Sequence, residues 1–214
     1  MKKYIAEFIG AFALVFCGTG AVIVNSLSEN SLGLLGISAA FGIIIIAMIY
    51  VFGSISGAHL NPAVTIGLLA GKKIQVKETV RYILSQILGA FLASGILYFI
   101  FPESKTLGET IPNGGILTSF ILEFILTFFL MLTILEITSK KEYSNLAGIV
   151  IGVVVIGIIL IAGPISGGSF NPARSLAPAI LSGNISSLWV YIVAPILGSI
   201  LAMFTRLYFS KDEN

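Results

Sequence analysis

The sequence predicts an all-α membrane protein with six transmembrane helices and two re-entrant half-helices, arranged as two inverted repeats. Three observations predict this fold class: a very high mean hydropathy, six long apolar stretches, and a nine-residue motif that occurs twice. Of the 214 residues, 57% are hydrophobic and only 10% are charged, and the mean hydropathy is +1.03. Because soluble domains carry far more charge, a lipid bilayer is the expected environment of this chain.

Six apolar stretches have the length of a transmembrane helix. A hydrocarbon core about 30 Å thick requires about 20 helical residues per crossing. The stretches are Tyr4–Asn25, Gly36–Gly53, Val80–Phe101, Leu117–Thr138, Leu146–Pro164 and Leu188–Phe209. With short loops they fill the chain, so we expect a single membrane domain over residues 1–214 and no room for a soluble enzymatic domain.

Basic residues are concentrated on one side of a six-crossing arrangement. Lys105 alone falls in the opposite loops, whereas one side receives Lys2, Lys3, Lys72, Lys73, Lys77, Arg81, Lys140, Lys141, Arg206 and Lys211. Since cytoplasmic loops carry an excess of Lys and Arg, both termini are expected in the cytoplasm and the protein in the plasma membrane. The net charge of +2 and the lack of a basic stripe give no support for nucleic-acid binding.

The chain is a tandem duplication. The segment Ile55–Ala63 matches Ile165–Ala173 at an offset of 110 residues, and the Glu-Phe pair at Glu7 recurs at Glu123. The repeats cover about residues 1–101 and 117–209, with three crossings each. Because three is an odd number, the second copy enters the membrane from the opposite face, which predicts two inverted repeats.

Each copy of the motif ends in Asn-Pro-Ala and is followed by an apolar run too short to span the bilayer. The six residues of the two triplets are Asn61, Pro62, Ala63, Asn171, Pro172 and Ala173. Asn is a preferred N-cap and Pro a preferred first helical residue, so each triplet predicts a helix start. Two half-helices inserted from opposite sides would meet, N-terminus to N-terminus, near the bilayer centre.

These features resemble the major intrinsic protein family, which contains the aquaporins and aquaglyceroporins. The paired Asn-Pro-Ala boxes, Arg174 directly after the second box, and the Ala-Glu-Phe sequence near the N-terminus carry the resemblance, which covers nearly the whole chain. It implies the aquaporin fold, in a right-handed bundle with one pore per protomer, and a homotetramer in the lipid bilayer. It implies a passive channel for water and small uncharged solutes, without a cofactor.

The Asn side chains predict how such a pore excludes protons. An N-cap Asn uses its carbonyl oxygen on the helix, which leaves its NH2 group as a donor. Asn61 and Asn171 are therefore expected to donate to one central water. The opposed half-helix dipoles direct about half a positive charge each at that point, which opposes cations and protons.

Resemblance to the family places a selectivity filter at Phe41, Ile159, Gly168 and Arg174. Water-selective members have His where this chain has Ile159, and glycerol facilitators have Asp where it has Ser175. The segment Gly163–Ser169, with Tyr191-Ile192, most resembles the nodulin-like branch and related microbial channels. That branch carries glycerol, urea and undissociated metalloid acids such as arsenous, boric or silicic acid. A water-selective aquaporin is the alternative.

Three further polar residues lie in apolar surroundings. Glu7 and Glu123, one per repeat, are expected to anchor the backbone of the pore loops, because a buried carboxylate needs hydrogen bonds. A proton relay is the other interpretation of these two residues. His59, the only histidine, is expected in the cytoplasmic vestibule. A metal site is not predicted there, because no second ligand lies at a suitable spacing.

A secondary transporter is the competing functional class, because inverted repeats with broken helices are also its architecture. Such transporters carry clusters of ionisable residues within the membrane, whereas this pore is expected to offer only Arg174. An ion channel lacks support because the sequence shows no ring of carboxylates. A membrane enzyme lacks support because no constellation of nucleophile and base is present.

Overall fold

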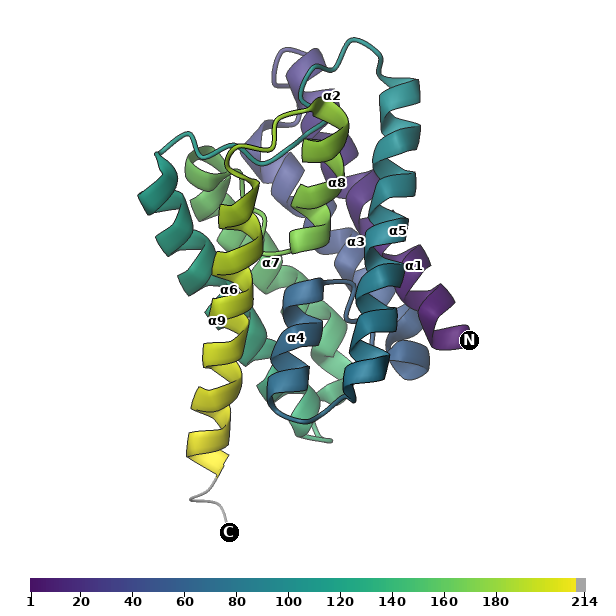
Figure 1. The fold of residues 1–214 in the computed structure, drawn as a ribbon, viewed down its shortest axis with the longest axis vertical. Helices are drawn as coiled ribbons and strands as arrows, with labels where there is room; N and C mark the ends of the chain where they lie inside the picture. Colours follow the sequence, from purple (N-terminus) through teal and green to yellow (C-terminus); the bar gives the residue numbers. More distant parts are fainter. Residues whose placement is uncertain (211–214) are drawn as a thin grey trace.

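The computed structural model describes residues 1–210, and within them the chain forms helices joined by loops (Figure 1). Lys211, one of the basic residues assigned above, and the end of the expected domain at 214 lie outside the described residues. Six helical segments are long and apolar enough to cross a membrane: Lys2–Leu27, Gly33–Ser56, Val76–Ile100, Ile116–Ser139, Ser144–Ser166 and Leu188–Phe209. The predicted six-crossing fold is therefore confirmed, and the chain is a multi-pass membrane protein.

The labels of Figure 1 divide these crossings further. The first crossing comprises α1 (Lys2–Leu14), a π-helical segment η1 (Val15–Thr19) and α2 (Gly20–Leu27). The others are α3 (Gly33–Ser56), α5 (Val76–Ile100), α6 (Ile116–Ser139), α7 (Ala147–Ser166, preceded by the short 3-10 turn η2 at Ser144–Leu146) and α9 (Leu188–Phe209). The two half-helices are α4 (Pro62–Ala70) and α8 (Pro172–Ser182). Figure 1 shows α4 and α8 one above the other in the middle of the bundle.

The two halves repeat each other in detail. Helix α1 packs on α5 as α6 packs on α9, and α3 packs on α7. Both α3 and α7 end at a glycine in the left-handed conformation, Gly57 with φ 85° and Gly167 with φ 83°. A left-handed glycine ends a helix without steric strain, so the same turn leads each chain segment into its pore loop.

Glycines permit close packing at the main helix crossings. A Cβ atom at Gly42 would lie 2.6 Å from the carbonyl oxygen of Gly152, and a Cβ at Gly152 would lie 2.6 Å from that of Gly42. In the same way, a Cβ at Gly89 would overlap the Phe8 carbonyl, and one at Gly198 the Phe124 carbonyl. Helices in a membrane associate mainly through van der Waals packing, so these backbone contacts hold the bundle together.

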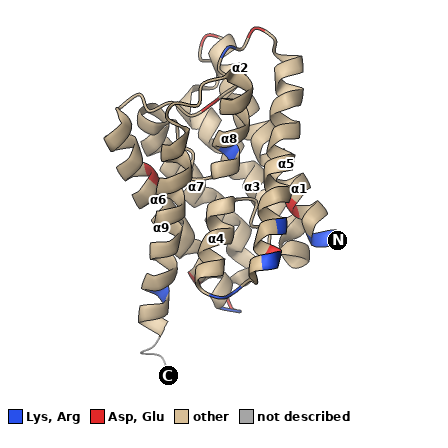
Figure 2. Cartoon of the chain, in the orientation of Figure 1, with Lys and Arg blue, Asp and Glu red and all other residues tan. Residues whose placement is uncertain are grey.

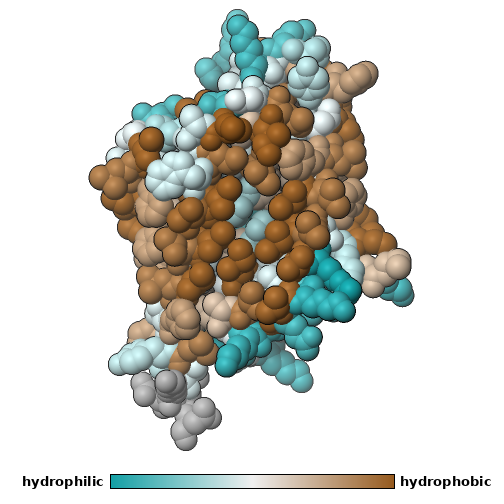
Figure 3. Space-filling model, viewed as in Figure 1, coloured by the Kyte–Doolittle hydropathy of each residue, from teal (hydrophilic) through white to brown (hydrophobic). Residues whose placement is uncertain are grey.

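The surface divides into an apolar belt and two polar ends. Figure 3 shows a broad hydrophobic band around the middle of the molecule, with hydrophilic residues above and below it. Figure 2 shows Lys and Arg residues gathered toward the end where both termini lie. Exposed Leu, Ile, Val and Phe side chains on α5, α6 and α9 are expected where lipid tails, rather than water, surround the protein.

We expect Gly89→Ala to lower the midpoint of thermal unfolding in detergent, because the new methyl group meets the Phe8 carbonyl, and overpacking of this kind costs about 1–3 kcal/mol. Gly95→Ala on the same helix is the matched control, since a Cβ there meets no atom within 4 Å. Equal unfolding midpoints for the two variants would contradict the packing argument.

Candidate functional site: a central channel between the two half-helices

The half-helices meet at their N-termini, as the duplicated motif predicts. The Oδ1 atom of Asn61 accepts from the N–H of Ala63 at 2.8 Å, and that of Asn171 accepts from the N–H of Ala173 at 3.0 Å. Each Asn is thus the N-cap of its half-helix, with Pro at the first helical position. The dipoles of α4 and α8 consequently point their positive ends at the same central point.

Each Asn side chain also crosses to the opposite pore loop, which the sequence did not predict. Nδ2 of Asn61 donates to the carbonyl of Phe170 at 2.7 Å, and Nδ2 of Asn171 donates to the carbonyl of Leu60 at 2.9 Å. An NH2 group has two hydrogens, so one N–H of each Asn remains for a molecule in the channel. These reciprocal bonds lock the two loops together and fix where the remaining donors point.

The two buried glutamates hold the pore loops, and both are fully shielded from solvent. Glu123 accepts from the hydroxyl of Ser166 and the N–H of Ser169, both at 2.8 Å, and from the N–H of Phe170 at 2.7 Å. Irregular backbone at membrane depth has no water to satisfy its N–H groups, so these carboxylate bonds are essential to the loop. Both carboxylate oxygens of Glu123 already accept hydrogen bonds from the loop, so this arrangement favours anchoring over a proton relay.

Glu7 repeats this arrangement in the first half and adds one partner. It accepts from the N–H groups of His59 and Leu60 at 2.9 and 2.7 Å, and from the Ser56 hydroxyl at 2.7 Å. The additional donor is Nε2 of Gln86 at 2.8 Å. The same Gln86 nitrogen donates to Thr65, the first-half counterpart of Ser175.

A cavity of about 560 Å³ runs along the half-helix junction. Asn61 and Asn171 line it together with the irregular loops Gly57–Leu60 and Gly168–Phe170, and His59 is part of this lining. The hydrophobic part of the wall comes chiefly from α3 and α7 and includes Ile45, Ile49, Ile151 and Val155. One wall therefore presents loop backbone and the other presents aliphatic side chains.

The structure places the four residues of the expected filter on this cavity, in two close pairs. All four line it, and the guanidinium carbon of Arg174 lies 5.2 Å from the centre of the Phe41 ring. Gly168 faces Ile159, because a Cβ atom at Gly168 would lie 3.6 Å from Cγ1 of Ile159. The residues thus form two neighbouring pairs around the lumen.

Arg174 is held by the loop between α5 and α6. Its Nη1 atom donates to the carbonyl of Gly108 at 2.8 Å, and the residue is only 1% exposed. Thr110 of the same loop bonds the Ser175 hydroxyl at 2.8 Å. Within residues 1–210, Nε of Arg174 has no hydrogen-bond partner, so the guanidinium retains a donor beyond its structural bond.

Helix geometry also positions Phe41, through a feature that sequence reasoning missed. The first crossing is not a regular α-helix but widens into the π-helical segment η1, which contains Gly18. A Cβ at Gly18 would overlap the Phe41 ring. Single π turns inside α-helices are frequent at functional sites. In the sequence, only Gly18 could have indicated this close approach to Phe41, but no local pattern distinguishes it from a glycine at an ordinary helix contact.

Among the described residues, no three His, Cys, Asp or Glu side chains lie close enough to bind a metal ion together. Of the residues that line the cavity, Arg174 is the one Lys, Arg, Asp or Glu. The polar groups along the cavity, namely the Asn side chains, Arg174 and the backbone of the pore loops, are suited to hydrogen bonding.

Known proteins are similar to this chain in sequence and in fold. Residues 1–206 match the family described as "Major intrinsic protein". Aquaporin NIP1-1 of Zea mays is 39% identical over 94% of this chain and 72% of its own length, and nodulin-26 of Glycine max is 38% identical over 94% of this chain and 74% of its own. A glycerol uptake facilitator protein-like 6 of Lactiplantibacillus plantarum is 41% identical over 99% of this chain and all of its own length. The aquaglyceroporin structure from Plasmodium falciparum superposes with a TM-score of 0.87 at 28% identity, covering 95% of this chain and 93% of that one.

The fold and the cavity define a passive membrane channel rather than an enzyme. The chain belongs to the major intrinsic protein family, the family of aquaporins and aquaglyceroporins. The predicted resemblance to the nodulin-like branch and to microbial channels is confirmed by the relatives from plants and Lactiplantibacillus plantarum.

We expect Glu123→Gln to lower the yield of folded protein strongly while leaving solute selectivity unchanged in the fraction that folds. The amide replaces an acceptor oxygen by a donor facing backbone N–H groups, and a lost hydrogen bond to a charged group costs about 1.5–3 kcal/mol. Glu7→Gln is expected to behave alike. Size-exclusion chromatography of detergent extracts measures the yield.

Glu136→Gln is the matched control on the same helix, α6. Glu136 is half-exposed and pairs with Arg206 at 3.2 Å, and an exposed pair of this kind contributes about 0–1 kcal/mol. Normal assembly of the Glu123 variant, combined with loss of a proton-dependent uptake, would replace the anchoring role by a transporter mechanism.

Proposed function

We propose that this chain conducts water and small uncharged solutes, namely glycerol, urea and undissociated metalloid acids such as arsenous, boric or silicic acid, while it excludes protons and ions. The observation that carries the proposal is the grouping of Phe41, Ile159, Gly168 and Arg174 on one cavity whose remaining wall is largely aliphatic. Gly168 contributes no side chain, and Ile159 contributes no donor or acceptor. The opening is consequently wider and less polar than a filter with His at that position.

Solute recognition in this proposal divides between the two sides of the filter. Hydroxyl groups of a polyol or metalloid acid accept from Arg174 and donate to carbonyls of the pore loops. The less polar side of the solute contacts Phe41 and Ile159. Replacing Ile159 with a hydrogen-bonding residue would favour water over larger solutes. Water would gain a hydrogen-bonding partner there, and it has no apolar side that needs the contact with Ile159.

The assembly and its orientation belong to the same proposal. We assign a homotetramer in the plasma membrane, with both termini cytoplasmic and one channel domain per chain over residues 1–214. Family membership supports the tetramer, and the gathering of basic residues at the end of the bundle that holds the termini supports the orientation (Figure 2). His59 lines the cytoplasmic vestibule in this orientation.

A stopped-flow panel on vesicles containing the purified protein tests the solute range. Water, glycerol, urea and boric acid are compared with protein-free vesicles, and uptake is repeated with and without an ion gradient. We expect all four to permeate and no dependence on the gradient. Fast water flux with no permeation of the other three solutes would identify a water-selective aquaporin, and gradient-dependent uptake would identify a transporter.

The filter itself is tested by substituting Gly168 and Ile159, one at a time. We expect Gly168→Phe to reduce glycerol flux at least tenfold, equivalent to about 1.4 kcal/mol of added barrier, with a smaller effect on water. Ile159→His is expected to raise the ratio of water flux to glycerol flux. A side chain at position 168 has to adopt the left-handed conformation, with φ 60°, which is strained but which the equivalent Ala58 of the first repeat adopts with φ 46°.

Val153→Phe serves as the control for these variants, since Val153 lies on α7 but is 56% exposed on the outer surface. It introduces the same aromatic side chain outside the channel and is expected to leave both fluxes unchanged. If Gly168→Phe suppressed water and glycerol equally, the residue would be a general constriction and not a selectivity element.

Proton exclusion follows from the paired Asn donors and the opposed helix dipoles. A water that accepts hydrogen bonds from both Asn61 and Asn171 cannot pass a proton along the file. We expect vesicles with fast water flux to show the same proton leak as protein-free vesicles, measured with a trapped pH dye. A proton ionophore gives the positive control, and a protein-dependent leak would refute this part of the proposal.

A further inference from the structure

A second cavity, of about 550 Å³, lies on the outside of the bundle near the N-terminus, away from the channel. It is formed by the start of α1, the loop between α4 and α5, and the first turns of α5. Its lining residues are Lys3, Tyr4, Lys72, Lys73, Ile74, Gln75, Lys77, Glu78 and Arg81. None of these residues lines the channel, so the two cavities are separate.

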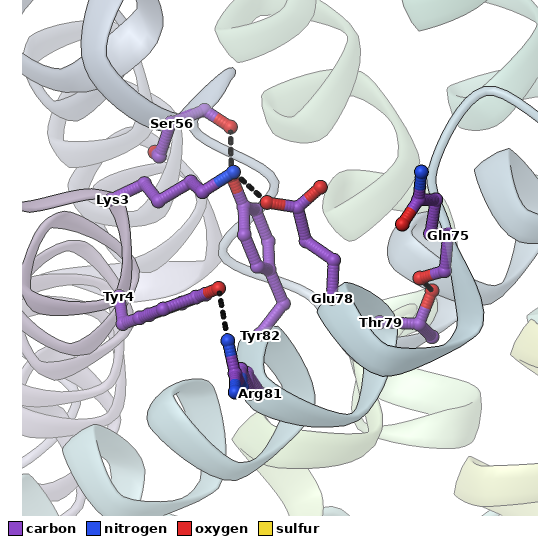
Figure 4. A network of polar contacts seen from close by, with 8 residues as sticks. All are labelled: Lys3, Tyr4, Ser56, Gln75, Glu78, Thr79, Arg81 and Tyr82. Carbon is purple, nitrogen blue, oxygen red and sulfur yellow. Dashed lines mark hydrogen bonds and ion pairs between the residues drawn. The ribbon is translucent and has the colours of Figure 1, made fainter. Parts of the chain in front are cut away.

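This basic pocket is the strongest concentration of positive charge in the described chain. It holds five Lys and Arg residues and one carboxylate, which leaves four net positive charges in a protein whose total is +2. The carboxylate of Glu78 is already neutralised by an ion pair with Lys3 (Figure 4). Among the described residues, Lys72, Lys73 and Lys77 form no ion pair. An anionic ligand would complete this arrangement.

The pocket has one side chain held in place for anion binding. Nη1 of Arg81 donates to the Tyr4 hydroxyl at 3.3 Å, and its guanidinium carbon lies 5.6 Å from the centre of the Tyr4 ring (Figure 4). An arginine fixed by a ring and a hydroxyl loses less freedom on binding, and its remaining N–H groups match two oxygens of a phosphate. Phosphate is therefore the anion that this geometry suits.

An apolar stripe runs from the pocket along the lipid-facing side of α5. Val76, Val80, Leu84, Leu88 and Leu92 recur at intervals of four residues, and all are exposed. Lys77 and Arg81 each precede a leucine of the stripe by seven residues, which places them over the same side of the helix. In Figure 3 a hydrophilic patch borders the hydrophobic band directly on the side of the molecule where the N-terminus lies.

We propose that this basic pocket binds the phosphate headgroup of an anionic membrane phospholipid, with an acyl chain lying along the α5 stripe. Basic pockets between helices at the cytoplasmic membrane surface bind such headgroups. A soluble phosphate would satisfy the charge but would leave the stripe unused. The combination of headgroup pocket and continuous apolar stripe therefore favours the lipid as the source of the phosphate.

The test uses the full chain in nanodiscs of phosphatidylcholine with a minor fraction of phosphatidylglycerol. After extraction into mild detergent, native mass spectrometry measures how much phosphatidylglycerol the protein retains. We expect strong enrichment over phosphatidylcholine, and we expect the double variant Lys77→Gln, Arg81→Gln to lower it about tenfold or more. Lys77→Gln alone is expected to give a partial loss, which keeps the test valid if the double variant folds poorly.

Lys140→Gln, Lys141→Gln is the matched control, because it removes two exposed lysines from the loop between α6 and α7, outside the pocket. It is expected to retain phosphatidylglycerol like the unmodified protein. If both double variants lost phosphatidylglycerol equally, the enrichment would depend on general surface charge and not on this pocket, which would overturn the proposal. Displacement of the lipid by millimolar inorganic phosphate or glycerol phosphate would identify a soluble-anion site instead, and absence of enrichment in the unmodified protein would refute binding altogether.

Discussion

The satisfaction of backbone N–H groups at membrane depth is the constraint on which the rest of this structure depends. A channel needs non-helical backbone near the bilayer centre, because a regular helix consumes its own polar groups. The N–H groups of the two pore loops then require acceptors that lipid cannot offer. Glu7 and Glu123 supply them, each with both oxygens occupied by loop donors. Two carboxylates that would be costly in isolation thus make the open loop backbone possible.

Rigid loops in turn determine where the channel's donors lie. Because the loops are fixed, the Asn caps reach across to carbonyls of the opposite repeat, at 2.7 and 2.9 Å. This cross-connection couples the two half-helices at the point where their dipoles oppose each other. The structural integrity of the centre and the proposed exclusion of protons therefore rest on the same two side chains, and capping and pore lining are not competing roles for them.

Periodic and duplicated features could be predicted from the sequence, whereas contacts between distant loops could not. The six crossings and the Asn-capped half-helices follow from hydropathy and from Asn-Pro-Ala, and their observed limits differ from the predicted ones by a few residues. The bond from Arg174 to the Gly108 carbonyl joins residues 66 positions apart in the sequence, and Gly108 lies in the irregular loop between α5 and α6, which carries no repeat. The π-helical segment η1 contains Gly18, whose lack of a side chain leaves room for the ring of Phe41 from another helix. Only the packed structure reveals such dependences.

The duplication also accounts for how the proposed selectivity would arise in one half of a symmetric scaffold. At the offset of 110 residues, the counterparts of Phe41, Ile159, Gly168 and Arg174 are Ile151, Ile49, Ala58 and Val64, and all four line the same cavity. One end of the channel therefore has an arginine and an aromatic ring, and the other has a purely aliphatic set in equivalent positions. Because the aliphatic set offers a solute no hydrogen-bonding partner and no charge, we propose that discrimination between solutes concentrates at Arg174. The inverted repeat thus supplies two equivalent sets of positions along the cavity, and in the proposed function the divergence of their side chains makes the set with Arg174 the filter.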